Sequence, residues 1–169
     1  PTMSKRRGRP DIIYILLEVT QESILNRRNM LRTYIHTRND FIITVNPLTR
    51  VPKSYNRFIG LFEDLFRKGT IGTMDKTLLS LHKGKLSDAV SEVGSDRVIL
   101  LSPRGETKRI SDFINEEDTT VIIGGFSEGD FLSDTKKFRE QYSIFNDELT
   151  IWSVGFEMIA SYERMIGLV

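Results

Sequence analysis

The stretch that decides the fold is YIHTRNDFIITVNPLTRVPKSYNRFIGL, which runs from Tyr34 to Leu61. Two β-rich runs, Tyr34–His36 and Phe41–Val45, are separated by four polar residues, a pattern typical of a β-hairpin. Asn46-Pro47 ends the second run, because proline cannot donate a hydrogen bond to a strand ladder. The sequence therefore predicts a hairpin here.

A helix is predicted after this hairpin. It begins after Ser54, a plausible N-cap, and ends at Gly69. Between them the apolar residues recur at spacings of three and four, which marks one face of a helix. These residues are Tyr55, Phe58, Ile59, Phe62, Leu65 and Phe66.

Three cations, Arg50, Lys53 and Arg57, flank the predicted start of this helix. Exposed N–H groups at a helix start also favour anions, and three cations at one place can neutralise phosphates. The alternative is a solvated helix entry. Basic residues at a helix N-terminus are mildly unfavourable for the helix dipole, and that cost favours the functional interpretation.

The N-terminal end combines a basic arm, residues 1–9, with an apolar run that starts at Asp11. The run is long enough for a buried strand or a short helix, and Asp11 as an N-cap favours the helix. Arg9 and Asp11 are joined by a stiff proline. A carboxylate can hold a guanidinium in one orientation, and an oriented arginine binds a phosphate or a base edge well.

The C-terminal half alternates predicted strands with helices, which indicates an α/β class. Buried strands are expected at 96–102, closed by Pro103-Arg104-Gly105, and at 119–126. A short helix is expected at 109–115, a polar helix or loop at 134–142, and a long, largely buried helix that includes Phe156 at 149–169. Residues 77–90 form a mixed region with His82 in a polar loop, and His36 lies within a strand pattern. For both histidines a structural role is favoured over a catalytic one.

Two segments in this half could bind a ligand. In VIIGGFSEGDF, residues 121–131, glycines follow a buried strand at the end where open α/β sheets bind ligands. The spacing matches neither G-x-G-x-x-G nor a P-loop, and on the motif alone a plain strand-to-loop turn is slightly favoured over a cofactor loop. In YSIFNDELTIW, residues 142–152, the loop could wrap an adenine, or could be an ordinary loop with Asp147 or Thr150 near a cap position.

Composition narrows the class of protein. The chain has 169 residues, 39% of them hydrophobic and 28% charged, which fits one domain with its own core. No cysteine is present, only two histidines occur, and no apolar run reaches the roughly 18 residues of a membrane span. We therefore expect an intracellular protein with no metal and no membrane partner. Residues 1–60 carry a net charge of +7 and the rest −6, which suggests a nucleic-acid partner or chance clustering.

Taken together, RRGRPD, the opening stretch, VIIGGFSEGDF and SIFNDELTIWSV resemble one family, in order and spacing along nearly the whole chain. It is the archaeal-type SPOUT class of methyltransferases that methylate N1 of a pseudouridine in small-subunit ribosomal RNA. The resemblance implies an α/β fold with a C-terminal trefoil knot, a homodimer, and S-adenosylmethionine bound in the knot. It implies one SPOUT domain over residues 1–169, with a basic linker at 1–9 and the knotted cofactor region at about 96–169.

The same resemblance assigns site residues. The RNA contacts fall on Arg9, Arg50, Lys53 and Arg57. Catalysis falls on Arg9 and Asp11: Asp11 either holds Arg9 or accepts the N1 proton, and Arg9 can stabilise an anionic target. The cofactor contacts are Leu101, Gly124, Gly129, Tyr142, Ser143, Ile144, Phe145, Asn146, Asp147 and Leu149.

Two departures from the family pattern are visible. The usual N-terminal strand and helix are not in this chain, and Lys53 stands where arginine is common, which keeps the charge but loses the bidentate fork. The expected function is methylation of small-subunit ribosomal RNA in the cytoplasm during ribosome biogenesis. The alternatives are a non-catalytic RNA-binding assembly factor of the small subunit and, less favoured, a SPOUT enzyme that acts on transfer RNA.

Overall fold

The computed structural model describes residues 10–124 and 138–169. The chain forms two compact units, an N-terminal unit that ends at Ala89 and a C-terminal unit that begins at Val90. Each unit has its own sheet and its own apolar core. Within the described ranges, no helix combines the length and the apolar character that crossing a membrane requires.

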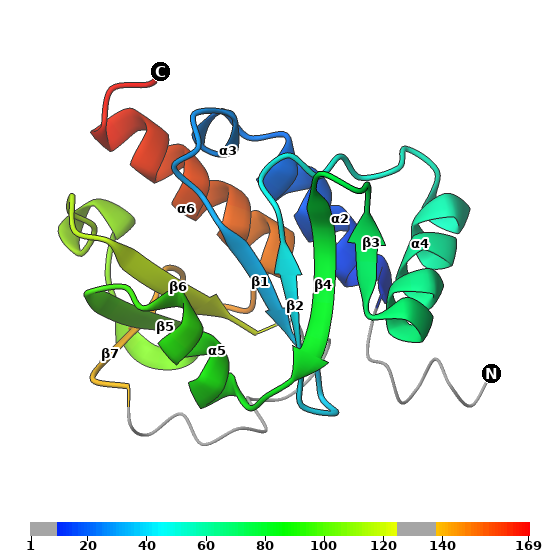
Figure 1. Cartoon of the computed structure of the whole chain (residues 1–169). Coiled ribbons are helices and arrows are strands. Elements are labelled where there is room, and N and C mark those ends of the chain that lie inside the picture. The colour runs from blue at the N-terminus through cyan, green and yellow to red at the C-terminus, as the bar shows by residue number, and fades with distance from the viewer. Residues whose placement is uncertain (1–9, 125–137) are drawn as a thin grey trace. The chain divides into compact units, whose positions relative to one another are not determined.

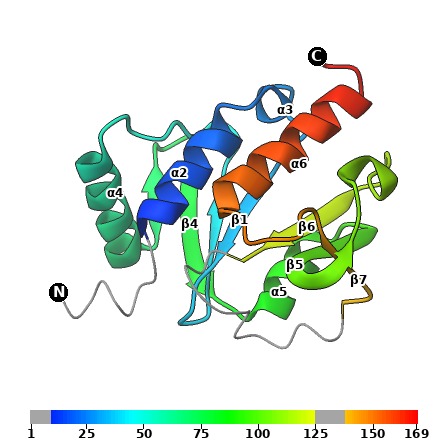
Figure 2. The same ribbon diagram turned by 180° about the vertical axis from the view of Figure 1, so that it is seen from behind.

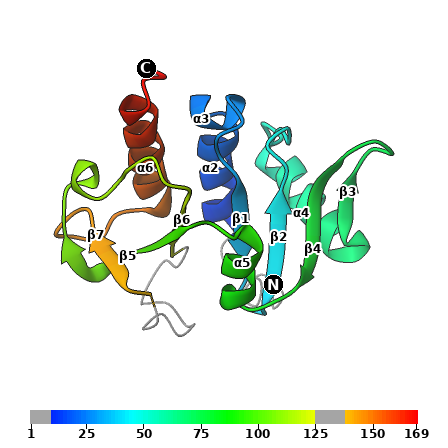
Figure 3. The ribbon, with the colours of Figure 1, turned by 60° about the vertical axis from the view of Figure 1, so that its left-hand side comes forward.

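The N-terminal unit is built on a four-stranded antiparallel sheet in the order β1-β2-β4-β3 (Figure 3). Its strands are β1 Thr33–His36, β2 Phe41–Val45, β3 Thr70–Gly72 and β4 Thr77–Lys83. The predicted hairpin is confirmed, because β1 pairs with β2 in register from Thr33 opposite Val45 to His36 opposite Ile42.

Two helices, α2 (Pro10–Gln21) and α4 (Tyr55–Lys68), cover one face of this sheet (Figure 2). Alternate strand residues point to that face, as the two-residue period of a strand requires. Phe58 and Leu65 of α4 and Leu17 of α2 are buried against them. Each such side chain contributes about 1.5–3 kcal/mol when fully buried. The strand residues of this core are Ile35, Ile43, Val45 and Leu79.

Both predicted ends of α4 are confirmed. The Ser54 hydroxyl accepts a hydrogen bond from the N–H of Arg57 at 3.4 Å, which caps the first turn. Gly69 ends the helix with φ at 83°, a left-handed conformation that glycine adopts without steric cost. The boundaries of this helix therefore follow from local signals in the sequence.

The apolar run after the basic arm forms helix α2, which confirms the favoured alternative. The helix begins at Pro10, a residue suited to the first helical position because its missing N–H would have no partner there. Asp11 consequently lies in the first turn and is not the N-cap. A short helix, α3 (Ile24–Arg27), follows, with the Ser23 side chain accepting from the N–H of Asn26 at 3.1 Å.

The prediction that His82 lies in a polar loop is wrong. His82 belongs to β4 and pairs with Ile42 of the central strand β2. Five consecutive residue pairs join these two strands, so non-local pairing overrides the mixed local composition. After β4, the helix α5 (Leu86–Val93) crosses the boundary between the two units.

The C-terminal unit contains a three-stranded parallel sheet in the order β6-β5-β7 (Figure 1). Its strands are β5 Arg97–Thr107, β6 Thr119–Ile123 and β7 Glu140–Ser143, accompanied by the short 3-10 helix η1 (Ile110–Asp112) and helix α6 (Ile151–Met165). A core of Ile99, Leu101, Phe113 and Met158 joins β5 to α6. A parallel sheet packed against helix α6 places this unit in the predicted α/β class.

Three predictions for this unit need correction. Strand β5 does not close at Pro103 but continues to Thr107, and Gly105 lies so close to β7 that a Cβ atom there would come within 2.6 Å of the Tyr142 nitrogen. Residues 140–142, expected in a helix or loop, form a strand because they pair with β5. The closing helix α6 runs from Ile151 to Met165 rather than over 149–169, and Phe156, expected among its buried residues, is 57% exposed.

Candidate functional site

The three cations singled out in the sequence lie where predicted, around the start of α4. Arg50 and Lys53 precede the helix and Arg57 lies in its first turn, and all three are exposed. A cationic group needs this exposure to meet a macromolecular anion. The placement is therefore confirmed, and the RNA-binding role remains a prediction.

Helix α2 holds the loop that carries these cations. The Tyr14 hydroxyl donates to the carbonyls of Pro52 at 3.1 Å and Lys53 at 3.0 Å. The Gln21 amide, only 1% exposed, donates to the carbonyls of Asn46 at 3.1 Å and Thr49 at 3.0 Å. These bonds satisfy backbone groups that a buried loop would otherwise leave unpaired.

A second buried amide supports the same loop from α3. Asn26 donates to the carbonyl of Pro47 at 2.9 Å and to the carbonyl of Gln21 at 3.0 Å. The Thr49 hydroxyl adds a bond to the carbonyl of Leu78 at 2.7 Å. Sequence reasoning missed Tyr14, Gln21 and Asn26. The only available signal was a glutamine at the end of an apolar run, which does not reveal its partner.

Two carboxylates, Glu18 of α2 and Glu22 just after this helix, face the cations. Lys53 Nζ lies 3.4 Å from Glu18 Oε2 and 3.8 Å from Glu22 Oε1, and Arg27 Nη2 lies 2.6 Å from Glu22 Oε2. The hydrogen bond from Arg27 is the largest cause that lowers the pKa of Glu22, and the charges of Lys53 and Arg50 lower it further, against a smaller opposing effect of burial. Glu22 is therefore an anion that helps to order the basic loop.

Arg9 lies outside the described residues, so its predicted pairing with Asp11 stays a prediction. Asp11 is half-buried in the first turn of α2. It stands at helical spacing from Tyr14, Glu18 and Glu22, which places it on the face of α2 that holds the loop. A guanidinium held by Asp11 would thus lie on the same face as the contacts to Lys53.

In the C-terminal unit, the structure brings the predicted cofactor residues together at one sheet edge. Leu101 of β5 lies opposite Ile123 of β6 and opposite Tyr142 of β7. Gly124 follows β6 directly and β7 ends at Ser143, so the carboxyl ends of two parallel strands lie beside Leu101 of the longer strand β5. This is the edge at which open α/β sheets bind ligands. Gly129, the other predicted glycine contact, lies outside the described residues.

Tyr142 is held by a charged network. Its hydroxyl donates to Glu140 Oε1 at 2.9 Å, and its ring stacks on Phe113 with centroids 4.5 Å apart. Glu140 accepts two bonds from Arg97, at 2.7 and 2.6 Å, and Arg97 also donates to the carbonyl of Phe113. The pKa of Glu140 is lowered by its bond to Arg97, and the pKa of Tyr142 is raised by burial and by its bond to Glu140. The Tyr142 side chain is thus committed to contacts within the protein.

The loop after β7 offers apolar and hydrogen-bonding groups to a ligand. Phe145 is 50% exposed and Leu149 is 39% exposed. Ser143 donates to the carbonyl of Phe145 at 2.5 Å, and Asp147 accepts from the N–H of Glu148 at 2.7 Å. No hydrogen bond among the described residues uses the N–H of Phe145 or Asn146. An adenine needs such backbone donors beside apolar surface, so this segment, Ile144 to Asp147 included, fits the nucleoside part of S-adenosylmethionine.

The fold and these features define an α/β protein. Its N-terminal unit carries a basic loop, and its C-terminal unit has a sheet edge of the kind at which α/β proteins bind ligands. The sequence pattern of one family matches residues 2–163. The chain belongs to this family, the EMG1/NEP1 methyltransferases.

Individual relatives agree with this assignment. The chain is 67% identical over 168 residues to the protein named Ribosomal RNA small subunit methyltransferase Nep1 of Thermoplasma volcanium, and 60% identical over 168 residues to that of Thermoplasma acidophilum. Each comparison covers 99% of this chain and 76% of the relative. The crystal structure of Archaeoglobus fulgidus Nep1 bound to S-adenosylhomocysteine matches with a TM-score of 0.82 and 34% identity, over 96% of this chain and 73% of that one.

Proposed function

We propose that the chain is an S-adenosylmethionine-dependent methyltransferase of small-subunit ribosomal RNA. The observation that carries this proposal is the 67% identity, over 99% of the chain, to a protein named for that activity. The Archaeoglobus fulgidus relative is bound to S-adenosylhomocysteine, which is what remains of S-adenosylmethionine after methyl transfer. The strand edge at Leu101, Gly124 and Tyr142 supports the same cofactor.

The finer parts of the proposal rest on the resemblance of the sequence motifs. The methyl acceptor is N1 of a pseudouridine, the protein acts as a homodimer in the cytoplasm, and one SPOUT domain contains a trefoil knot within about residues 96–169. The close approach of Gly105 to the backbone of β7 supports a tightly threaded C-terminal unit. A knot is otherwise rare enough that periodicity alone would not suggest it.

The residues divide into two groups. Leu101, Gly124, Gly129, the segment 142–147 and Leu149 hold the cofactor, whose sulfonium supplies an activated methyl group when it is bound. Arg50, Lys53 and Arg57 neutralise RNA phosphates and position the target. Because the target base must leave its stack to be reached, the protein must also hold it in an unstacked position.

Arg9 and Asp11 act at the acceptor ring. The N1 proton must leave as the new N1–carbon bond forms. Asp11 either accepts this proton, or fixes Arg9, which then stabilises the N1 anion that remains once the proton has passed to water. The variant Arg9→Ala is expected to lose methylation while keeping its cofactor affinity, which single-turnover kinetics and calorimetry measure separately. Unchanged turnover would remove Arg9 from the site.

The deciding experiment supplies methyl-labelled S-adenosylmethionine to the protein with small-subunit ribosomal RNA or with transfer RNA, followed by nucleoside mapping. The expected product is labelled N1-methylpseudouridine in the ribosomal RNA alone. Label in transfer RNA would indicate a different substrate. Cofactor that fails to bind in calorimetry, together with retained RNA binding, would indicate a non-catalytic assembly factor.

A further inference from the structure

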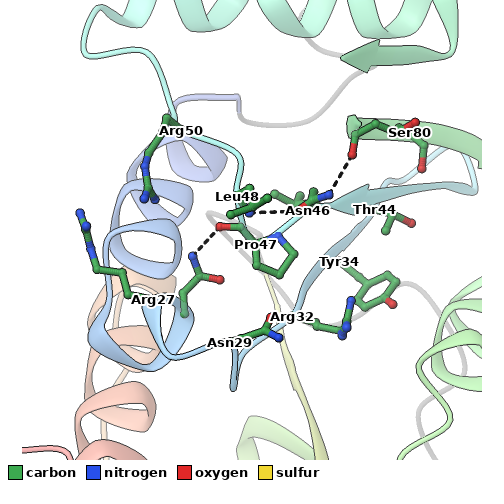
Figure 4. A pocket seen from close by; sticks show the side chains of 13 residues that line it. Arg27, Asn29, Arg32, Tyr34, Thr44, Asn46, Pro47, Leu48, Arg50 and Ser80 are labelled. Atoms are coloured by element: carbon green, nitrogen blue, oxygen red, sulfur yellow. Dashed lines mark hydrogen bonds between the residues drawn. The ribbon is translucent and has the colours of Figure 1, made fainter. Parts of the chain in front are cut away.

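A pocket of about 730 Å³ lies on the N-terminal unit, beside the turn at Asn46, Pro47 and Leu48 (Figure 4). Its floor comes from a row of paired residues across the sheet, in which Tyr34 lies opposite Thr44 and Thr44 opposite Ser80. Because neighbouring strand residues alternate between faces, this row points away from the face that α2 and α4 cover. None of the predicted cofactor residues lines this pocket.

The pocket is strongly basic. Arg27, Arg32 and Arg50 line it, and no aspartate or glutamate is among its described lining residues. Figure 4 shows Arg27 and Arg50 on one side of the Pro47 turn and Arg32 beside Tyr34 on the other. Arg27 is paired with Glu22, and Arg50 makes one long bond, 3.5 Å, to the carbonyl of Gln21. Arg32 is exposed and makes no ion pair within the described part of the chain. Such a surface attracts an anion.

The remaining lining groups suit a nucleotide better than a small inorganic anion. Tyr34 and Pro47 provide apolar surface, and a tyrosine ring is a platform on which any base can stack. Thr44 and Ser80 add hydroxyl groups on the same sheet face. A volume of 730 Å³ lies within the range of about 300–1,000 Å³ that ligand pockets occupy. Single-stranded RNA binds to surfaces that combine arginines, aromatic rings and hydroxyl groups. This antiparallel sheet carries all three.

We propose that this pocket is a second RNA subsite, which takes one unpaired nucleotide of the ribosomal RNA substrate. The base stacks on Tyr34, Arg32 contacts its phosphate, and Arg27 and Arg50 contact the neighbouring phosphate. This inference rests on the proposed function, because it assigns the pocket to the same substrate. Arg50 borders both the pocket and the basic loop before α4, so the two RNA-contacting surfaces are continuous within the N-terminal unit.

The test measures binding of a fluorescent uridine tetranucleotide by anisotropy, over a range of salt concentrations. Arg32→Gln is expected to reduce the slope of log K against log salt by about one, because one phosphate contact is lost. Tyr34→Leu is expected to weaken binding roughly 5- to 150-fold through the loss of stacking, whereas Tyr34→Phe keeps the ring and wild-type affinity. Arg28→Gln is the matched control: Arg28 is an exposed arginine that does not line the pocket, and its removal should change neither quantity.

Cofactor affinity by calorimetry and the far-ultraviolet dichroism spectrum establish that each variant is folded. If folded Arg32→Gln and Tyr34→Leu bind the tetranucleotide as tightly as Arg28→Gln does, the subsite does not exist. The methylation assay decides the proposed function separately. If the protein methylates no RNA but the pocket variants weaken tetranucleotide binding as expected, the enzymatic role is wrong and the nucleotide pocket remains. If the protein methylates ribosomal RNA but the pocket variants bind the tetranucleotide normally, only the pocket is wrong.

Discussion

Replacing Gln21 by leucine removes the buried amide that holds the loop before α4. The Gln21 amide donates to the carbonyls of Thr49 and Asn46 at 3.0 and 3.1 Å, and leucine fills a similar volume without a donor. Thr49 is 4% exposed, and its carbonyl has no other partner among the described residues. The carbonyl of Asn46 keeps a bond from the N–H of Thr49 at 2.9 Å. The replacement thus leaves one buried carbonyl unpaired and weakens a second.

The cost follows from these two carbonyls. A buried polar group left without a partner costs about 1–3 kcal/mol, and the loss of one bond at a group that keeps another costs about 1 kcal/mol. The unfolding free energy of the N-terminal unit should therefore fall by about 2–4 kcal/mol. Because the loop also carries Arg50 and Lys53, its affinity for RNA should fall together with its stability.

Amide hydrogen exchange is the suitable assay, because the chain's single tryptophan, Trp152, lies in the other unit and cannot report this change. Peptides from α2 and residues 46–53 should lose protection in Gln21→Leu, while peptides from β5 and α6 serve as an internal control. Asn115→Leu is the control variant. Among the described residues the exposed Asn115 amide bonds only to exposed Glu117, donating to its carboxylate at 3.3 Å and accepting from its N–H at 3.0 Å. A loss below about 1 kcal/mol with unchanged RNA affinity would refute the reasoning.

Three further variants test other parts of the structure. Glu140→Gln should remove one pH dependence of stability. The pKa of Glu140 is lowered in the folded protein, so the wild-type protein should lose stability as the pH falls below the ordinary range of a glutamate. Thermal unfolding of the variant should lack this contribution to the loss of stability in acid. Equal acid sensitivity of both proteins would contradict the network. Gly105→Ala should destabilise the C-terminal unit by about 1–3 kcal/mol, measured by Trp152 fluorescence in urea, because its Cβ would meet the β7 backbone at 2.6 Å; wild-type stability would show that β7 can move away at no cost. Lys53→Ala should lower the salt slope of RNA binding by about one and change stability little, since Lys53 is 76% exposed and such ion pairs contribute about 0–1 kcal/mol. An unchanged slope would mean that Lys53 contacts no phosphate.

The sequence predicts the elements that depend on local signals. The hairpin of β1 and β2 follows from alternation and a polar turn, and α4 follows from its period and from Ser54 and Gly69 at its ends. Strand β7 could not be predicted in this way, because Glu140 and Gln141 are polar. It forms because β5 pairs with it and because Arg97 neutralises the carboxylate of Glu140. Both causes lie far away in the sequence.

The candidate site likewise contains residues that the sequence alone predicts and residues that only the structure brings together. Cations stand out in a sequence, so Arg50, Lys53 and Arg57 were predicted from spacing and charge. The cofactor residues came from the resemblance, and only strand pairing places Leu101, Gly124 and Tyr142 at one edge. Gln21 and Asn26 were not predicted, because the role of a side-chain amide depends on its hydrogen-bond partners. Here the partners are backbone carbonyls, which no sequence pattern marks.

The apolar run that forms helix α2 was compatible in sequence with a strand or a helix. The contacts of this helix show the reason, and they also show why a helix here matters for function. Its residues Ile12 and Leu17 are buried, while Tyr14, Glu18 and Gln21 face the loop before α4. A helix that meets protein on two sides lacks a continuous polar face, so its hydrophobic period is weak. The same arrangement ties the basic loop to the core. A cation that must hold one phosphate needs a fixed backbone, and α2 supplies that backbone with hydrogen bonds rather than with further charge.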